Sequence, residues 1–521
     1  MNAIAACLPP FGFALALVVA AVAVTAGLLV ARADLRRYLF LPVLAPLATA
    51  AASVFNGLAS VLGGHRGAVA EGSASGWPWL LSLVACGVAI GYAVPRRGRY
   101  YRLERGATLL TPREAGEFLS TRRRALGGDA VTLAGWPLSD ADETKHCKLI
   151  GTTGAGKTTA ITELLHGALA RGDRAVIADP DGGYLRRLYS QSRGDRILTP
   201  FDARAARWDL FGEITEPYQA DELARALIPE TDGTAREWAS YGRTFLAAVI
   251  RQLRDSPRAT MEELYRLLLV ADMRELALLL DGTPAQPFLE PGNERMFGSL
   301  RSVTANAVRG LEYARAQRAE PLAVGEWVRS GEGVLFLPYR ADQVAALRSL
   351  ICAWLRLAIF QTLSLEPISD PASRRLWFVI DELDALGTID GLTDALARLR
   401  KFGGRCVLGF QSIAQVSSVY GAGPAQTLIE NCGTTLILRC SSSEGGGTAK
   451  FASRLVGDRE VSVEQVTRST ATGGGKGSTS RTTQRRTEPA LLAAQIEQLP
   501  DRAGYLKIAS QPQWVPVELR L

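Results

Sequence analysis

The sequence has few of the residues that build metal sites or disulfide frameworks. Seven cysteines and three histidines occur among 521 residues, and no two cysteines form a CxxC pair. This scarcity argues against a structural zinc site and against a secreted, disulfide-bonded fold. Several cysteines stand inside apolar, strand-like runs, where a cysteine usually acts as a small buried hydrophobe. We therefore expect reduced thiols in a cytosolic setting.

Charge is missing from the start of the chain. No charged residue precedes Arg32, and no lysine precedes Lys145. The first 95 residues contain three long apolar runs, at residues 11–31, 38–63 and 77–94. About 20 apolar residues cross a hydrocarbon core. A cleaved signal peptide is disfavoured because the first ten residues carry no lysine or arginine. We expect a membrane domain over residues 1–95.

The arginines around these runs predict how the chain crosses the membrane. Arg32, Arg36 and Arg37 follow the first run, several arginines follow the third, and only Arg66 lies between the second and third. Three spans then satisfy the positive-inside rule, with the amino terminus outside. Two spans stay open as an alternative, because prolines and an asparagine weaken the second run. In both arrangements the chain beyond Pro95 is cytoplasmic.

Two stretches lack any clear periodicity. Residues 96–130 are rich in arginine and include the run "STRRRA", which predicts an irregular, basic juxtamembrane linker. Contact with lipid headgroups or solvent fits this linker better than a role in binding DNA. Residues 467–488 are polar and low in complexity, and they predict a mobile loop.

The remaining chain alternates short apolar runs with helical stretches. Continuous runs such as "LWFVI" and "TTLIL" are typical of strands buried on both faces of a parallel sheet. The predicted strands are Arg174–Ala178, Gly333–Pro338, Leu376–Ile380, Arg405–Phe410 and Thr434–Leu438, with further strand character from 505 to 521. This pattern predicts a doubly wound α/β nucleotide-binding core at residues 131–212 and 318–521. Residues 213–317 show helical periodicity instead, which predicts an inserted all-α subdomain.

A phosphate-binding loop opens this core. The strand "CKLI" runs into Gly151, Thr152, Thr153, Gly154, Ala155, Gly156, Lys157, Thr158 and Thr159, which satisfies G-x-x-x-x-G-K-[ST]. Glycines let successive backbone N–H groups face a phosphate, and the positive end of the following helix adds to that field. Lys157 can reach the β- and γ-phosphates, and the Thr158 hydroxyl can bind Mg²⁺. The expected ligands are ATP and Mg²⁺.

A second motif lies far downstream, in "RRLWFVIDELDAL". Asp381 at the end of an apolar strand can hold Mg²⁺ through water. Glu382, directly after it, can polarise the water that attacks the γ-phosphate. Asp384 fits a helix-start residue better than a ligand. Alone, this motif is weak, but together with the complete phosphate loop it predicts an ATPase.

Other signatures narrow the class of ATPase. The sequence contains no N-K-x-D guanine motif and no L-S-G-G-Q stretch, which disfavours GTPases and ABC transporters. Gln411 ends the strand in "VLGFQS", where a polar side chain either senses the γ-phosphate or simply caps the strand. Asp179 ends another strand, in "RAVIADPDGG", and is either a polar group near the nucleotide or a turn-former.

Arginines and aromatic residues supply further candidates. Arg400, on a helix, can act as an arginine finger in a neighbouring subunit or merely face solvent. Arg439, after "TTLIL", competes with it for that role. Trp208, Trp238 and Tyr241 can stack on bases, although burial in the core is the better prediction for each of them.

Taken together, these segments resemble the type IV coupling proteins of conjugation systems. The resemblance rests on the apolar amino-terminal runs and the helical insertion, together with "GTTGAGKTT", "VIADPDGGY", "FDARAARWDLFGE", "FVIDELDAL" and "GFQSIAQV". It implies a RecA-like motor domain with an all-α domain, anchored in the bacterial inner membrane and assembled as a hexameric ring. It also implies ATP-driven transfer of DNA, single-stranded and attached to its relaxase, toward a type IV secretion channel.

The resemblance also implies roles for particular residues. Lys157 and Thr158 would bind nucleotide and Mg²⁺, Asp381 and Glu382 would form the second motif, Gln411 would form the third, and Arg400 would be the arginine finger. The possible third membrane span departs from the usual two. The long acidic carboxyl tail of some relatives is absent, so we expect no relaxase recognition by such a tail.

Two other functions remain open. One is a double-strand DNA translocase of the chromosome-segregation type, although the residues after Thr467 are few and loop-like for the terminal winged helix of such proteins. The other is a membrane receptor that docks protein substrates to a secretion channel, with ATP only stabilising its assembly.

Overall fold

The structure, a computed structural model, describes residues 101–230, 233, 235–469 and 478–520. The predicted membrane spans lie outside these residues. One unit of the molecule comprises Arg102–Val463 and Thr483–Leu521 and holds the whole α/β core. The other unit comprises Met1–Tyr101 and Glu464–Thr482, of which residues 101, 464–469 and 478–482 are described.

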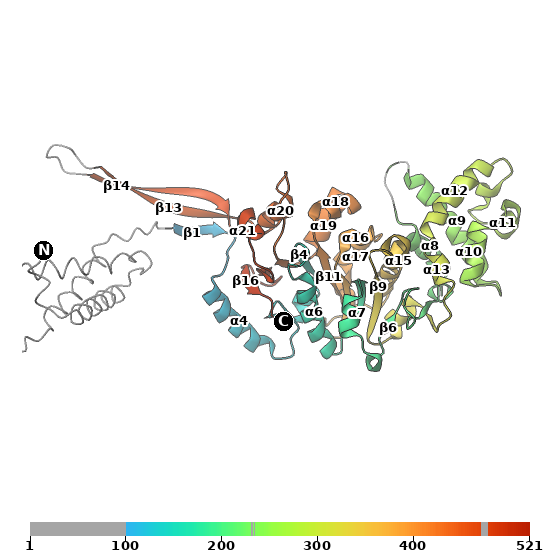
Figure 1. Cartoon of the computed structure of the whole chain (residues 1–521), viewed down its shortest axis with the longest axis horizontal. Coiled ribbons are helices and arrows are strands. Elements are labelled where there is room, and N and C mark those ends of the chain that lie inside the picture. Colours follow the sequence, from blue (N-terminus) through green and yellow to red (C-terminus); the bar gives the residue numbers. More distant parts are fainter. Residues whose placement is uncertain (1–100, 231–232, 234, 470–477, 521) are drawn as a thin grey trace, which may run out of the picture. The chain divides into compact units, whose positions relative to one another are not determined.

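The core is built on one sheet with the strand order β16-β15-β12-β4-β11-β10-β5-β9-β6 (Figure 1). The bounds are β4 (Cys147–Ile150), β5 (Arg174–Pro180), β6 (Arg196–Ile197), β9 (Val334–Tyr339), β10 (Leu376–Ile380), β11 (Gly404–Phe410), β12 (Thr434–Ile437), β15 (Ala503–Lys507) and β16 (Val515–Glu518). From β12 to β6 all neighbours pair in parallel, and β15 and β16 are antiparallel. The five predicted strands are confirmed.

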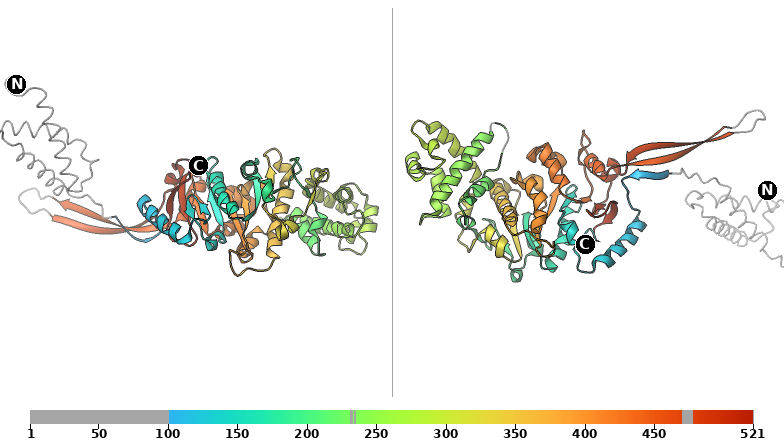
Figure 2. Two further views of the ribbon diagram at one scale, coloured as in Figure 1. Left: turned by 90° about the horizontal axis from the view of Figure 1, so that it is seen from below. Right: turned by 180° about the vertical axis from the view of Figure 1, so that it is seen from behind.

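Helices cover both faces of this sheet (Figures 1 and 2). Their bounds are α5 (Asp140–Glu143), α6 (Lys157–Ala170), α7 (Gly183–Leu188), α14 (Val324–Ser330), α15 (Val344–Leu363), α16 (Leu383–Leu386), α17 (Leu392–Leu399), α18 (Ile413–Tyr420), α19 (Ala422–Glu430), α20 (Gly447–Val456) and α21 (Ala493–Glu497). Alternate residues of each central strand enter opposite cores: Val176 packs on the side of α15 and α17, and Ile177 on the side of α6 and α7. Burial on both faces explains the continuous apolar runs.

The predicted helical insertion contains no strand among its described residues, 213–230, 233 and 235–317. Its helices are α8 (Gln219–Leu227), α9 (Ala235–Arg254), α10 (Met261–Leu269), α11 (Met273–Leu279), α12 (Glu294–Ala307) and α13 (Leu311–Ala314), beside the short 3-10 turns η3 (Phe211–Glu213) and η4 (Gln286–Leu289). The chain enters and leaves it through two paired strands, β7 (Arg207–Trp208) and β8 (Pro321–Leu322). The domain boundaries drawn from the sequence remain predictions.

The sequence predicts an irregular linker over residues 96–130, and this prediction is wrong for residues 101–126. They form β1 (Tyr101–Gly106) and α4 (Pro112–Leu126). A capping box starts α4, with the Thr111 and Glu114 side chains bonded to each other's backbone N–H groups. β1 needs a distant partner, β13, and such a pairing leaves no local trace in the sequence.

The expected mobile loop is also wrong in large part. Strands β13 (Asp458–Ser469) and β14 (Ser478–Pro489) follow each other and form a three-stranded sheet in the order β1-β13-β14. Glu460 pairs with Arg105 on β1, and Ser462 donates its hydroxyl hydrogen to Glu104. Residues 480–487 of β14 are all exposed, and a polar strand of this kind lacks the apolar alternation that identifies a strand from sequence.

One described helix, α15, is long and apolar enough to cross a membrane. More than half of its apolar stretch is buried inside the fold, where the helix packs against α8, α14 and α17. It is therefore a core helix of the α/β domain, which explains its composition without a membrane.

Buried ion pairs close the amino ends of the central strands. Arg405 and Glu143 are both fully buried, and Arg405 Nε donates to Glu143 Oε2 at 2.8 Å. Arg171 donates from both terminal nitrogens to the same carboxylate, at 3.0 and 2.9 Å. Asp140 accepts from Arg375 and Arg405. Each charge here has a charged partner, as buried ions require.

His146 belongs to this end of the sheet and is not a strand residue, because its φ of +60° places it in the turn before β4. Its Nδ1 accepts the Cys406 N–H at 3.0 Å, and its Nε2 donates to the Leu396 carbonyl at 2.9 Å. Burial is the main cause that lowers the pKa of His146 to about 4, and the positive charge of the nearby Arg405 acts in the same direction. The ring is therefore neutral and structural.

Candidate nucleotide site

The phosphate loop joins β4 to α6 at the carboxyl edge of the sheet. Gly154 and Gly156 have φ values of +78° and +114°, which residues with a side chain rarely adopt. A Cβ on Gly156 would lie 2.9 Å from Leu519 Cδ1, and one on Gly151 would lie 2.9 Å from Leu438 Cβ. These glycines are thus required by conformation and by space, and the loop keeps its backbone open to a phosphate.

Lys157 starts α6 and is buried. Its Nζ donates to the Gly151 carbonyl at 2.6 Å, within the loop itself. Burial lowers the pKa of the Lys157 ammonium, and the negative charges of Asp381 and Glu382 oppose that shift. A desolvated cation at the end of the phosphate loop suits the β- and γ-phosphates of a nucleotide.

The predicted magnesium ligands do lie together. Thr158 Oγ1 donates to Asp381 Oδ2 at 2.9 Å. The other carboxylate oxygen, Asp381 Oδ1, is buried and has no hydrogen-bond partner within the described ranges. A buried, unsatisfied carboxylate oxygen beside a hydroxyl is a donor set that a hard divalent cation prefers. The residues present therefore fit Mg²⁺.

Glu382 and Gln411 are linked across two strands. β11 (Gly404–Phe410), which Gln411 directly follows, lies between the phosphate-loop strand β4 and the Asp381 strand β10. Gln411 Nε2 donates to Glu382 Oε1 at 3.2 Å, and its Oε1 accepts from Thr153 Oγ1 at 2.8 Å. Burial raises the pKa of Glu382, as do the neighbouring Asp381 and Asp384. A strand-end glutamine thus connects the phosphate loop to the candidate base.

The other predicted loop residues take supporting positions. Thr152 donates its backbone N–H to the Arg439 carbonyl at 2.8 Å, which ties the loop to the end of β12. Ala155 is fully buried, and Thr159 is half-buried on α6. Asp384 lies in the first turn of α16, as expected, and burial raises its pKa.

Asp179 and Tyr184 complete the site from the neighbouring strand β5. Asp179 accepts the backbone N–H groups of Tyr184 and Leu185 at 3.0 and 2.7 Å, which anchors the first turn of α7. Burial raises the pKa of Asp179 to about 6. Tyr184 donates its hydroxyl hydrogen to Asp381 Oδ2 at 2.7 Å. The sequence reasoning missed Tyr184, although it follows a strand end in "VIADPDGGY".

The two candidate arginines lie at opposite ends of the sheet. Arg400 is exposed in the 3-10 turn η5 (Arg400–Phe402), just before the amino end of β11, whereas Gln411 follows its carboxyl end. Arg400 therefore cannot reach the site of its own chain. Arg439 lies beside the phosphate loop, with its side chain paired to Asp501 at 2.6 Å.

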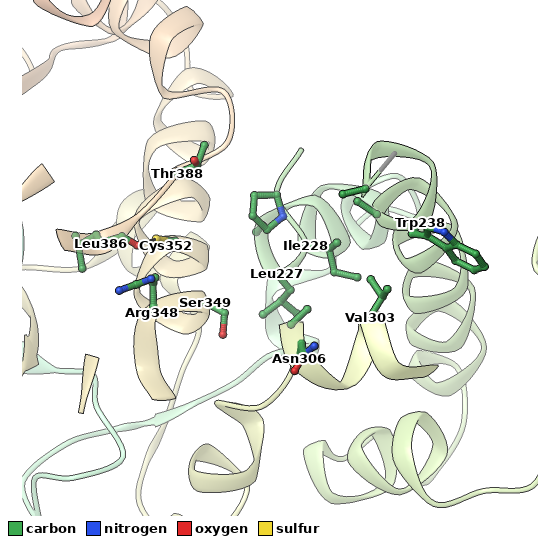
Figure 3. A pocket seen from close by; sticks show the side chains of 15 residues that line it. Leu227, Ile228, Trp238, Val303, Asn306, Arg348, Ser349, Cys352, Leu386 and Thr388 are labelled. Carbon is green, nitrogen blue, oxygen red and sulfur yellow. Dashed lines mark hydrogen bonds between the residues drawn. The ribbon is translucent and has the colours of Figure 1, made fainter. Parts of the chain in front are cut away.

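The aromatic candidates lie away from this site. Trp208 is fully buried, edge-on to Trp354, and is a core residue as expected. Trp238 stacks edge-on against Tyr241 and lines an apolar pocket of about 480 Å³ between the helical subdomain and α15–α16 (Figure 3). The five described cysteines are free and buried, and the described residues contain no cluster of potential metal ligands of three or more.

Comparison with known proteins places the chain in a family. The family model described as the type IV secretion-system coupling protein DNA-binding domain matches residues 130–520. The coupling protein TraD of Escherichia coli (strain K12) is 33% identical over 337 residues, which make up 63% of this chain and 46% of TraD. The chain thus spans less than half the length of this curated relative.

Solved structures of the plasmid coupling protein TrwB extend the similarity to the fold. TrwB in complex with ADP and Mg²⁺ is 31% identical, with a TM-score of 0.71 over 80% of this chain and 94% of that chain. Unbound TrwBdeltaN70 gives 0.70, with 31% identity, over 81% and 94%. The predicted RecA-like α/β core is confirmed, and the chain belongs to the type IV secretion-system coupling proteins.

Proposed function

We propose that the chain is a motor of the bacterial inner membrane that hydrolyses ATP and moves relaxase-bound, single-stranded DNA into a type IV secretion channel. The observation that carries this proposal is the connection of Thr153, Gln411 and Glu382 across three elements. A site that only binds nucleotide needs no more than the phosphate loop. A candidate base linked to that loop is what hydrolysis coupled to movement requires.

Nucleotide and metal have clear counterparts in the relatives. TrwB structures hold ADP with Mg²⁺ and a non-hydrolysable ATP analogue. In this chain Lys157 and the loop N–H groups would hold the phosphates, and Thr158 and Asp381 would hold Mg²⁺. When bound, Mg²⁺ supplies positive charge that offsets the negative charge developing on the phosphate oxygens.

The protein's own side chains would then carry the hydrolytic step. Glu382, with its raised pKa, is suited to orient a water molecule and accept its proton. Gln411 holds the Glu382 carboxylate in place and contacts the loop through Thr153. Loss of the γ-phosphate on hydrolysis could therefore alter the contacts of Gln411 and, through it, the position of β11.

Assembly as a hexameric ring would complete the site in trans. Arg400 is exposed and far from its own nucleotide loop, which suits an arginine finger for a neighbouring subunit. Arg439 is already paired with Asp501 and fits that role less well. Membership of the family supports DNA and the secretion channel as partners.

The test uses the full chain purified in detergent. We expect ATP hydrolysis to rise when single-stranded DNA is added, and Lys157→Thr to abolish this activity. Stimulation should weaken steeply with salt, because phosphate contacts release counterions. Stronger stimulation by duplex DNA would favour a double-strand translocase. Transfer of DNA in cells that carry only Lys157→Thr would instead support the docking-receptor function.

A further inference from the structure

Tyr184 makes a contact that the phosphate loop and the Asp381-Glu382 motif do not account for. Its ring is enclosed, with 1% of its surface exposed, and its hydroxyl meets Asp381 Oδ2 at 2.7 Å. Thr158 donates to the same oxygen at 2.9 Å. Two hydroxyl donors therefore converge on one carboxylate oxygen, while Oδ1 has no partner in the part of the chain described.

The backbone holds Tyr184 firmly in this position. It lies one residue beyond the start of α7, which follows Asp181 and Gly182, both in the left-handed region at φ +57° and +65°. Asp179 then binds the N–H groups of Tyr184 and Leu185. Because β5 pairs in parallel with β10, Asp179 and Asp381 end neighbouring strands at the same edge. The phenol is thus delivered to Asp381 by the adjacent strand.

This arrangement fixes how the Asp381 carboxylate is turned. A carboxylate with no donors can rotate and present either oxygen, whereas one held by two hydroxyls on Oδ2 presents only Oδ1. We propose that Tyr184 is a positioning residue that orients Asp381 for Mg²⁺ and thereby couples α7 to the metal-bound state of the nucleotide site. The inference rests on the nucleotide and Mg²⁺ binding proposed above.

The experiment measures binding rather than turnover. A fluorescent ADP analogue is titrated into the full chain in detergent, first in EDTA and then over a range of Mg²⁺ concentrations. Removing an outer partner of a metal ligand typically weakens metal affinity about 10- to 100-fold. We expect Tyr184→Phe to raise the Mg²⁺ concentration needed for half-maximal tightening about tenfold, with unchanged ADP affinity in EDTA.

The matched control is Tyr420→Phe. Tyr420 lies on α18, and its hydroxyl accepts the Ile389 N–H at 3.2 Å. This variant therefore also loses one hydrogen bond of a tyrosine hydroxyl, but at a position that does not contact Asp381. Its Mg²⁺ dependence should match the wild type. If Tyr184→Phe does not fold, Asp179→Asn loosens the anchor of α7 and should shift the Mg²⁺ dependence in the same direction.

Three results would overturn the inference. The first is an unchanged Mg²⁺ dependence in Tyr184→Phe, or in Asp179→Asn where that variant is used instead. The second is an equal loss of ADP affinity with and without Mg²⁺, which indicates a purely structural role. The third is a wild-type chain whose ADP binding does not respond to Mg²⁺, which defeats the proposed magnesium site together with the inference.

Discussion

The two ends of the central sheet bury charge in different ways. At the amino ends, Arg405 and Glu143 are fully buried and hydrogen-bonded to each other. At the carboxyl ends, Asp381 and Asp384 each keep a buried oxygen that meets no donor among the residues described. The same strands therefore carry a closed ionic network at one end and an incomplete one at the other.

We infer from this difference that the amino ends of the strands serve stability and that the carboxyl ends serve function. A buried ion that lacks a partner costs free energy, and proteins retain such groups where a ligand supplies the partner. The closed network at the amino ends can hold the strands in register, while the open, incomplete network at the carboxyl ends can bind a cation and a phosphate. Substitutions of the same kind at the two ends should accordingly have opposite consequences.

The largest effect is expected at the open end. Glu382→Gln removes the candidate base and should lower the rate of ATP hydrolysis by about 10²- to 10⁴-fold. The unfolding midpoint should stay the same or rise slightly, because one carboxylate leaves a cluster that already holds Asp381 and Asp384. Steady-state hydrolysis and thermal unfolding check both. Glu326→Gln, on the exposed side of α14, is the control and should change neither.

The same exchange at the closed end should do the reverse. Glu143→Gln leaves Arg405 and Arg171 buried beside a neutral amide, and breaking a buried pair in this way costs about 3–5 kcal/mol of stability. Denaturation followed by tryptophan fluorescence measures the loss. Nucleotide affinity of the folded fraction should be retained. A stable Glu143→Gln with impaired nucleotide binding would contradict the division between the two ends.

Acid should weaken the closed end through His146. The folded pKa of about 4 lies below the unfolded value near 6.5, so between these values only the unfolded chain takes up the proton. Stability should therefore fall as pH drops from 7.5 to 5, by about 2 kcal/mol from this group. His146→Asn tolerates the positive φ and should remove that component. An equally steep pH dependence in the variant would argue against it.

The smallest effect concerns the link between loop and base. Gln411→Ala keeps Glu382 but frees its side chain, and we expect hydrolysis to fall about tenfold, the size of one lost positioning hydrogen bond. Stimulation by DNA should fall more than the basal rate if Gln411 couples the site to β11. Gln426→Ala removes a surface amide that donates to Glu430 and should leave both rates unchanged.

Much of the core could be predicted because its signals are local. The strand, the glycine-rich turn and the apolar face of α6 follow one another in the chain. The residues that form that face are all buried: Ala160, Ile161, Leu164, Leu165, Ala168 and Leu169. Continuous apolar strands likewise announce burial on two faces. Gln411 could be placed at a strand end, although not beside Thr153.

The parts that were missed depend on contacts between distant residues. Tyr184 reaches Asp381 only because β5 lies next to β10, and a sequence does not state which strands are neighbours. β1 and β14 are polar and depend on β13, so periodicity does not identify them. The start of α4 is different, since the Thr111–Glu114 capping box was a readable local signal that the density of arginines obscured.

The strands β7 and β8 give the helical subdomain a particular mechanical connection. Its entry and exit are paired in register, Arg207 with Pro321 and Trp208 with Leu322. The buried Glu213 carboxylate joins them by accepting hydrogen bonds from Trp208 Nε1 and the Val324 N–H. A force on the helical subdomain would therefore be shared by two connecting strands that are hydrogen-bonded to each other. Such a double connection is stiffer than a single flexible linker.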